Sequence, residues 1–267
     1  GEEQPVAPTP EPGIPARPPT LCAGCSHRGP FYVLSKLGAT VTGDIGCYTL
    51  GVAPPLSAMD AGLCMGASIG MAIGMKKAKL PSKRIAAVIG DSTFFHSGMT
   101  GLLDAVYNQT PVTVIVLDNR ITAMTGHQPN PGSGRTALGD AVPAVSIAAI
   151  ARAFGVPRVH EVDPYDLAGM EKVFAECLDS GETCLVVVRG PCVLNEKKGG
   201  KQISFVDPAT CRACGACLRL GCPAIVRGEP KTPGSKAHIA AIDPASCIGC
   251  TLCNQVCPFG AISTQTL

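Results

Sequence analysis

A repeated cysteine pattern in the last 57 residues constrains the fold more than any other feature of the 267-residue chain. Eight of the 15 cysteines lie there, in two runs that each follow an Asp-Pro-Ala motif and end in Cys-Pro. Thiolates at this spacing are typical of 4Fe-4S clusters, and in two-cluster bacterial ferredoxins the fourth cysteine of each run binds the other cluster. The pattern therefore predicts one cluster on Cys211, Cys214, Cys217 and Cys257, and a second on Cys247, Cys250, Cys253 and Cys222.

The same thiolates could instead bind two structural zinc ions, because each such site needs only four cysteines. Two triplets with a trailing Cys-Pro favour the iron–sulfur interpretation. A disulfide scaffold would spread its cysteines through a short secreted chain, so this crowding indicates a reducing, cytoplasmic location. No apolar segment approaches the ~20 residues that span a bilayer, so no membrane contact is expected. The net charge of only +2 does not predict the broad basic surface that nucleic-acid-binding proteins carry.

Composition shifts divide the chain into three parts. Residues 1–20 contain seven prolines, which predicts an extended linker, preceded by more chain or contacted by a partner. The charged, Gly-rich stretch at 195–204 predicts a domain boundary. We therefore expect a first domain over residues 21–200 and, over 201–267, a small α+β ferredoxin domain of the bacterial type, stabilised by two 4Fe-4S clusters.

Strand and helix patterns alternate through residues 21–200. Short apolar strands are predicted at 85–89 and 112–117, and this alternation predicts an α/β fold, a doubly wound parallel sheet with helices on both faces. A long helix is predicted over 59–77, with Gly62, Gly66, Gly70 and Gly74 on one face. That face would pack either on its own sheet or against a second domain or a cofactor.

Oxygen-bearing side chains follow the two apolar strands, where each strand ends. Asp91 follows the first strand and Asn119 the second, and 27 residues separate them, enough for one crossover helix. Mg²⁺ prefers such oxygen ligands and completes its shell with substrate phosphates. Gly90 would let phosphates approach the backbone, and Ser92 would begin a helix whose free N–H groups face them. Alternatively, Asp91 and Asn119 only cap helices.

A third group of cysteines falls at the ends of predicted elements. Cys22, Cys25, Cys47 and Cys192 could converge at one sheet edge and bind a third 4Fe-4S cluster. The alternatives are a zinc site or a set of reduced, partly buried thiols.

The Gly90–Ser92 and Asp118–Asn119 segments resemble the GDG…NN signature of thiamine diphosphate enzymes. By that resemblance Asp91, Asn119 and the main-chain carbonyl of Ile121 bind Mg²⁺. Five longer motifs are similar to the indolepyruvate ferredoxin oxidoreductase alpha-subunit family, which also ends in a two-cluster ferredoxin domain: CAGCSHR at 22–28, GDIGCYTLG at 43–51, MGASIG at 65–70, GDSTFFHSG at 90–98 and DNRITAMTGHQ at 118–128.

This family resemblance implies an activity. It is the CoA-dependent oxidative decarboxylation of a 2-oxoacid, such as indolepyruvate or another arylpyruvate, to an acyl-CoA and CO₂, with electrons passing through 4Fe-4S clusters to external ferredoxin. Thiamine diphosphate with Mg²⁺ would bind near Gly46, Cys47, Gly90, Asp91, Ser92, Asn119, Thr125 and Gly126, and the third cluster would use Cys22, Cys25, Cys47 and Cys192. His96 and His127 are candidates to orient or protonate the substrate.

The same resemblance implies partners. Thiamine enzymes of this kind need a glutamate on a pyrimidine-binding domain, so we expect another segment or subunit to supply it. A beta- or gamma-type subunit for the CoA chemistry is also expected, hence a hetero-oligomer.

Two other functions stay open: an electron-transfer subunit with a non-catalytic thiamine-type domain, and a non-redox thiamine carboligase or decarboxylase.

Overall fold

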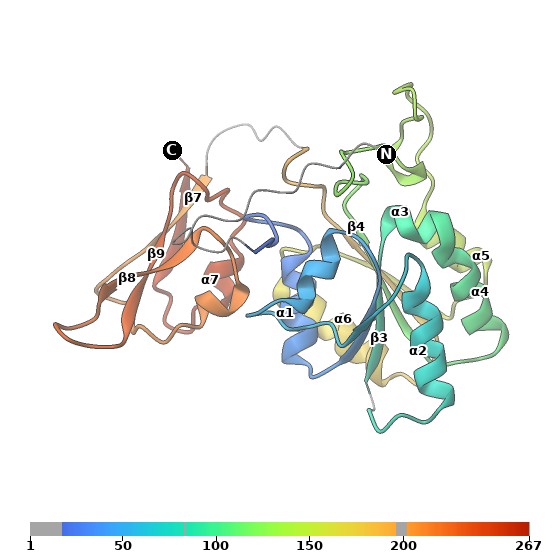
Figure 1. Ribbon diagram of the computed structural model, residues 1–267, viewed down its shortest axis with the longest axis horizontal. Helices are drawn as coiled ribbons and strands as arrows, with labels where there is room; N and C mark the ends of the chain where they lie inside the picture. The colour runs from blue at the N-terminus through green and yellow to red at the C-terminus, as the bar shows by residue number, and fades with distance from the viewer. Residues whose placement is uncertain (1–17, 83, 196–201, 267) are drawn as a thin grey trace, which may run out of the picture.

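The structure is a computed structural model that describes residues 18–82, 84–195 and 202–266. Most of the expected linker and the middle of the expected boundary lie outside these residues. The described chain forms a larger α/β part and a smaller part built from the cysteine runs, which lie side by side (Figure 1).

The larger part contains one six-stranded parallel sheet in the order β2-β1-β3-β4-β6-β5. Its strands are β1 (Thr40–Gly43), β2 (Ala61–Gly62), β3 (Ile85–Gly90), β4 (Thr113–Asp118), β5 (Arg158–Val162) and β6 (Cys184–Arg189). Every residue of β3 and β4 is buried, as continuous apolar runs predict for strands covered on both faces. This confirms the predicted parallel sheet. The strand order reverses between β1 and β3, and ligands of such sheets bind outside that point.

Helices cover both faces of the sheet. Helices α1 (Arg28–Lys36) and α6 (Leu167–Asp179) lie on the face toward the smaller part, whereas α2 (Ala67–Lys77), α4 (Met99–Tyr107) and α5 (Ile147–Ala153) lie on the other face (Figure 1). Alternate residues along a strand enter different cores. For example, Val88 of β3 packs with α6, whereas Ile89 packs with α2.

Short helical turns occupy the loops that follow the strands. These are η1 (Cys47–Val52), α3 (Asp91–Thr93), the π-helical turn η2 (Phe94–Gly98) and η3 (Pro131–Ser133). A π-helical turn inside a helix often marks a functional site, and η2 directly follows α3, the helical turn that begins at Asp91.

The prediction of one long Gly-rich helix over 59–77 is wrong in its first half. Gly62 belongs to β2, and Gly66 is the N-cap of α2 with a left-handed φ of 86°, so the helix begins only at Ala67. Gly70 and Gly74 are exposed, and a Cβ added at either would meet nothing within 4 Å. The four glycines therefore do not form one helix face packed on the sheet.

The smaller part contains two antiparallel strand pairs and two short helical segments. Strand β7 (Gln202–Val206) pairs with β10 (Ile262–Thr266), and β8 (Ile225–Pro230) pairs with β9 (His238–Ile242). Each helical segment contains the third cysteine of one run: η4 (Cys217–Leu220) contains Cys217, and α7 (Leu252–Val256) contains Cys253. The core beneath α1 and α6 continues into Leu220 and Leu252 of this part, so the two parts share one apolar interior.

Among the helices that the structure describes, none is long and apolar enough to cross a membrane.

Candidate cofactor and cluster sites

The carboxyl ends of β1, β3 and β4 open into one cavity of about 100 Å³, here called the strand-end cavity. Gly90, the last residue of β3, is in register with Leu117 of β4, which brings the two following loops together. The sequence-predicted residues that line the cavity are Gly46, Cys47, Gly90, Asp91, Ser92, Asn119, Ile121 and Thr125. The structure thus brings together eight residues from three separate loops.

Asp91 is a buried carboxylate beside a second buried carboxylate. It is 3% exposed and accepts a hydrogen bond from the side-chain amide of Asn130 at 3.0 Å. Burial, together with the nearby charge of Asp118, raises the pKa of Asp91 to about 7. Asp118 itself is paired with Arg189 at 2.9 Å. A site with this donor chemistry fits a hard cation such as Mg²⁺.

The loop after β4 is held in an unusual conformation that fixes Asn119. The Asn119 side-chain oxygen accepts the amide of Ile121 at 3.2 Å, which forms a tight turn around the Ile121 position. Arg120 inside this turn has a φ of 63°, rare for a residue with a side chain. Thr122 donates to the Ser92 hydroxyl at 2.8 Å, so the loops after β3 and β4 are tied to each other.

Tyr48 borders the strand-end cavity, and the sequence analysis did not single it out. Its hydroxyl hydrogen-bonds to the buried carboxylate of Asp44, which also accepts the amide of Gly66 at 3.1 Å and the Ser68 hydroxyl at 2.9 Å. A Cβ added at Gly46 or Gly90 would lie 2.3 or 2.6 Å from the Tyr48 ring. Close approach to this ring is therefore the structural reason for both glycines.

Asn130 is the second residue that sequence reasoning missed. It caps η3 and is 6% exposed, yet it lies 39 positions from its partner Asp91. Only its place before a proline marked it as a turn residue in the sequence. Tyr48, by contrast, directly follows the predicted Gly46–Cys47 pair, so a buried polar group there could have been suspected.

The two candidate histidines lie away from the strand-end cavity. His96 is exposed, and its Nδ1 lies 3.1 Å from the Ser97 hydroxyl. His127 has a φ of 64°, and its Nε2 lies 4.0 Å from the Cys192 sulfur. Gly126, with a φ of 115°, is likewise outside the residues that line the cavity, although neighbouring Thr125 lines it.

A second cavity of about 100 Å³ adjoins the strand-end cavity and is called here the N-terminal cysteine cavity. The predicted cysteines Cys22, Cys25, Cys47 and Cys192 all line it. Cys47 and Asn119 line both cavities, so the two share a wall. Burial raises the pKa of Cys25 to about 12, so this thiol needs a cation or a cluster to become a thiolate.

His27 also lies in this shared wall. It is 4% exposed, lines both cavities and packs edge-on against Tyr48 with a centroid distance of 6.2 Å. Burial lowers its pKa to about 4, so its ring is neutral. Neither ring nitrogen has a hydrogen-bond partner among the described residues, and buried polar atoms without partners are rare. His27 is therefore a buried polar group without a hydrogen-bond partner in the wall that the two cavities share.

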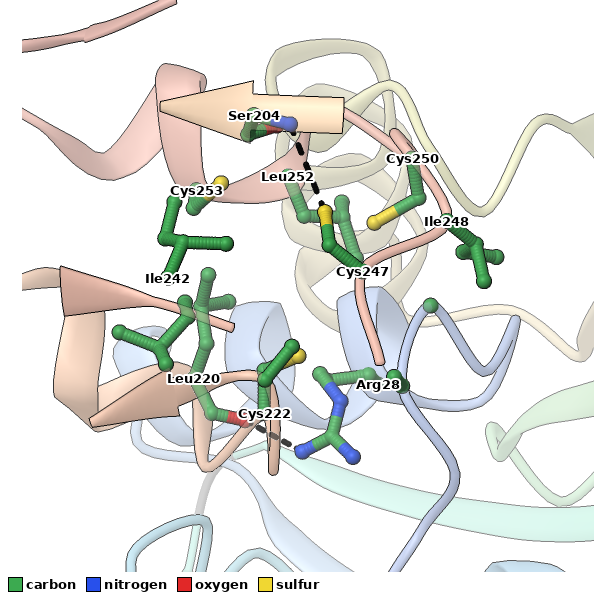
Figure 2. A pocket seen from close by; sticks show the side chains of 14 residues that line it. Arg28, Ser204, Leu220, Cys222, Ile242, Cys247, Ile248, Cys250, Leu252 and Cys253 are labelled. Carbon is green, nitrogen blue, oxygen red and sulfur yellow. Dashed lines mark hydrogen bonds between the residues drawn. The ribbon is translucent and has the colours of Figure 1, made fainter. Parts of the chain in front are cut away.

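Two further cavities contain the cysteines of the repeated runs. The junction cavity lies where the two parts meet and is lined by Cys222, Cys247, Cys250 and Cys253 together with Gly24 and Arg28 (Figure 2). The outer cavity is lined by Cys211, Cys214, Cys217 and Cys257. Each cavity therefore gathers three cysteines of one run and the last cysteine of the other, the same two sets that the sequence predicts.

Backbone amides donate to two of these sulfurs. The Ser204 amide lies 3.4 Å from the Cys247 sulfur, and the Ala261 amide lies 3.3 Å from the Cys257 sulfur. Such N–H donors stabilise thiolates and fit the ligands of iron–sulfur clusters. Across residues 18–82, 84–195 and 202–266, no group of three His, Cys, Asp or Glu side chains has the geometry for a single metal ion.

Comparisons with known families agree with this division of sites. The family model described as "Thiamine pyrophosphate enzyme, C-terminal TPP binding domain" matches residues 44–188. This range includes all three loops, after β1, β3 and β4, that line the strand-end cavity. A model described as "4Fe-4S dicluster domain" matches residues 210–261.

Curated relatives and a solved structure are also similar. The chain is 41% identical to "Indolepyruvate oxidoreductase subunit IorA" of Methanothermobacter marburgensis and 42% identical to the protein of the same name from Pyrococcus abyssi. These matches cover 95% and 93% of this chain but 41% of each relative, so the chain spans less than half of their length. A 2-oxoglutarate:ferredoxin oxidoreductase from Magnetococcus marinus shares the fold, with a TM-score of 0.57 and 18% identity over 68% of this chain and 67% of that one.

Proposed function

Because this chain belongs to the thiamine pyrophosphate enzymes that carry the C-terminal TPP-binding domain, we propose that it is the cofactor-binding and electron-transfer part of a 2-oxoacid:ferredoxin oxidoreductase. One observation carries the proposal: Cys47 and Asn119 line both the strand-end cavity and the N-terminal cysteine cavity. A cofactor held by Asn119 would therefore lie next to a thiolate-bound electron acceptor. A decarboxylase without a redox step would have no use for that shared wall.

In the strand-end cavity, Asp91, Asn119 and the Ile121 carbonyl would hold Mg²⁺, and Ser92 and Thr125 would contact the diphosphate of thiamine diphosphate. When bound, the thiazolium ring of this cofactor supplies an electron sink for decarboxylation of a 2-oxoacid. The protein's own contribution is to hold the metal and the phosphates at three loops, with the Tyr48 ring packed against the two glycines of the site. Asn130, which donates to the Asp91 carboxylate, would hold it in place for the metal.

Three cysteine sets would carry the electrons. Cys22, Cys25, Cys47 and Cys192 would bind the third cluster, beside the cofactor. The junction cavity and the outer cavity would each bind one of the two ferredoxin clusters. Cys214 of the outer cavity is exposed, which suits transfer to an external ferredoxin. Because thiolate ligands of this kind persist in reducing compartments, a cytoplasmic protein is expected.

Other chains or segments would complete the enzyme. No glutamate is among the described residues that line the strand-end cavity, so the activating glutamate would come from a pyrimidine-binding segment or subunit. A further subunit would handle CoA. In this arrangement, residues 21–200 form the cofactor domain and residues 201–267 form the ferredoxin domain. Residues 1–20 form the connection to the other parts of the enzyme.

The substrate proposal is an arylpyruvate, because the curated relatives are named for indolepyruvate. His127, beside Cys192, and His96, on η2, remain candidates for contact with that substrate. Replacing each by Asn and comparing kcat with KM would separate a proton-transfer role from a binding role.

The test is an anaerobic assay of the complete complex with a panel of 2-oxoacids, following ferredoxin reduction and acyl-CoA formation. Arylpyruvates should give the highest kcat/KM, and omission of CoA should stop turnover. Reduction of ferredoxin by none of the 2-oxoacids would contradict the proposal. If the complex lacked thiamine diphosphate yet transferred electrons, the chain would be an electron-transfer subunit with a non-catalytic thiamine-type domain.

A further inference from the structure

Arg28 is a buried cation at the junction of the two parts of the molecule. It is 2% exposed, although it begins helix α1 in the α/β part and the cavity that it lines belongs to the ferredoxin cysteines. Its guanidinium donates to the Leu220 carbonyl at 2.7 Å on one side and to the Leu21 carbonyl at 2.6 Å on the other. Arg28 therefore joins the segment before Cys22 to the segment before Cys222.

No carboxylate balances this charge within the described parts of the chain. The partners of Arg28 in hydrogen bonds are three backbone carbonyls, of Leu220, Leu21 and Cys22, and its buried Nε has no partner. Taking an unpaired guanidinium out of water is costly. Burial lowers the pKa of Arg28, and the neighbouring sulfurs of Cys222 and Cys25 oppose that shift, since negative charge on either would favour the charged guanidinium. The negative groups available to balance Arg28 are cysteine sulfurs.

The position of Arg28 is fixed by close packing. In Figure 2 its guanidinium lies next to Cys222, with the sulfurs of Cys247 and Cys250 across the cavity. A Cβ added at Gly221 would lie 3.3 Å from Nη1 of Arg28, so the chain directly before Cys222 packs tightly on the cation. Likewise, a Cβ at Gly24 would lie 2.1 Å from Ile248, so the Cys22–Cys25 loop packs against the Cys247–Cys250 loop.

We propose that Arg28 is the internal counter-cation of the junction cluster, the one bound by Cys222, Cys247, Cys250 and Cys253, and that its charge raises the reduction potential of this cluster. This inference rests on the proposed function. One-electron reduction adds one negative charge to the cluster, and a fixed positive charge in a low-dielectric site favours that added charge. Arg28 is thus a positioning residue that keeps the junction cluster able to accept an electron from the neighbouring N-terminal cysteine site, which is oxidised in the same step.

The outer cavity provides an internal comparison. Its lining arginine, Arg212, is exposed, so solvent screens its charge. The effect of Arg28 should therefore be confined to the junction cluster, whose cavity it lines.

The experiment is a redox titration of the anaerobically purified chain, followed by EPR, for wild type, Arg28→Met, Arg28→Gln, Arg28→Lys and Arg212→Met. The signal that disappears in a Cys222→Ser chain identifies the junction cluster. We expect Arg28→Met and Arg28→Gln to lower its midpoint potential by about 59 mV or more, a tenfold change in the one-electron equilibrium. Arg28→Lys, which keeps the charge, should retain most of the wild-type potential, and Arg212→Met should leave the junction cluster unchanged.

Each other outcome has a defined meaning. Unchanged potentials in Arg28→Met and Arg28→Gln chains with full iron content would overturn the proposal, and so would equal shifts in Arg28→Met and Arg28→Lys. If the two neutral variants lose the four irons of the junction cluster and Arg28→Lys keeps them, charge is required and the proposal stands. Loss of those irons in all three variants would assign Arg28 a purely structural role. A wild-type chain without iron would instead refute the proposed function itself.

Discussion

The backbone amide of Cys192 donates a hydrogen bond to the carbonyl oxygen of Asn119 across 3.0 Å. This bond joins the loop after β6 to the loop after β4, and the neighbouring Gly190 amide repeats the contact on Asp118 at 3.1 Å. A proposed cluster ligand and a proposed Mg²⁺ ligand are therefore fixed to each other by the main chain. Substitution of the Cys192 sulfur should remove the cluster without displacing Asn119.

Iron analysis tests the cluster count. We expect about twelve irons per wild-type chain, for three four-iron clusters, and about eight in a Cys192→Ser chain with thiamine diphosphate binding retained. The matched control is Cys64→Ser, because Cys64 is exposed and lines none of the four cavities described above. About eight irons in the wild type, unchanged by Cys192→Ser, would exclude the third cluster.

Asn130 should affect metal binding through its hydrogen bond to Asp91. Its amide orients the Asp91 carboxylate, and loss of such an outer partner typically weakens metal binding by about 10- to 100-fold. We expect Asn130→Ala to lower Mg²⁺-dependent retention of thiamine diphosphate by this amount, measured by equilibrium dialysis. Asn108→Ala makes the same chemical change on the exposed end of α4 and should have no effect. Equal retention in both variants would contradict the role given to Asn130.

Two glycine-to-alanine substitutions should change stability in opposite directions. At Gly90 a new Cβ would lie 2.6 Å from the Tyr48 ring, so Gly90→Ala should destabilise the chain by about 1–3 kcal/mol and reduce cofactor binding. At Gly70, inside helix α2, the added methyl meets nothing within 4 Å, so Gly70→Ala should stabilise it by about 0.5–1 kcal/mol. Thermal unfolding under anaerobic conditions measures both. A stabilising Gly90→Ala would show that the Tyr48 contact does not require glycine.

The raised pKa of Asp91 predicts that metal binding depends on pH. Burial and the charge of Asp118 raise this pKa to about 7, so below that pH a proton competes with the metal for the carboxylate. Mn²⁺ affinity, followed by the EPR signal of the free ion, should fall about tenfold per pH unit below about pH 7 and level off above it. Asp140→Asn, at an exposed loop position, should keep this profile. A flat profile across pH 7 would mean that Asp91 does not bind the metal.

The sequence determined which chemical groups the protein carries and roughly where they fall. Spacing of the cysteine runs predicted the two sets that later line the junction and outer cavities, because the fourth cysteine of each run was assigned to the opposite set. Continuous apolar strands ending in Asp91 and Asn119 predicted a sheet edge where those side chains meet, since parallel strands deliver their carboxyl ends to one side. The Gly-rich helix failed because a periodic glycine pattern does not reveal where a helix begins. In the structure, β2 and the left-handed N-cap Gly66 occupy the first half of the segment for which a helix is predicted.

Only the tertiary structure decided which distant groups face one another. Asn130 reaches Asp91 over 39 positions and Arg28 reaches Leu220 over 192 positions, and no local pattern encodes either contact. The shared wall of Cys47, His27 and Asn119 likewise results from how three loops pack at the strand ends. Residue types and periodicity are local properties of the chain, whereas burial, charge balance and shared cavities depend on the packing of all its elements. For that reason the sequence predicts candidate ligands, whereas only the fold shows that Arg28 lies in the wall of the junction cavity.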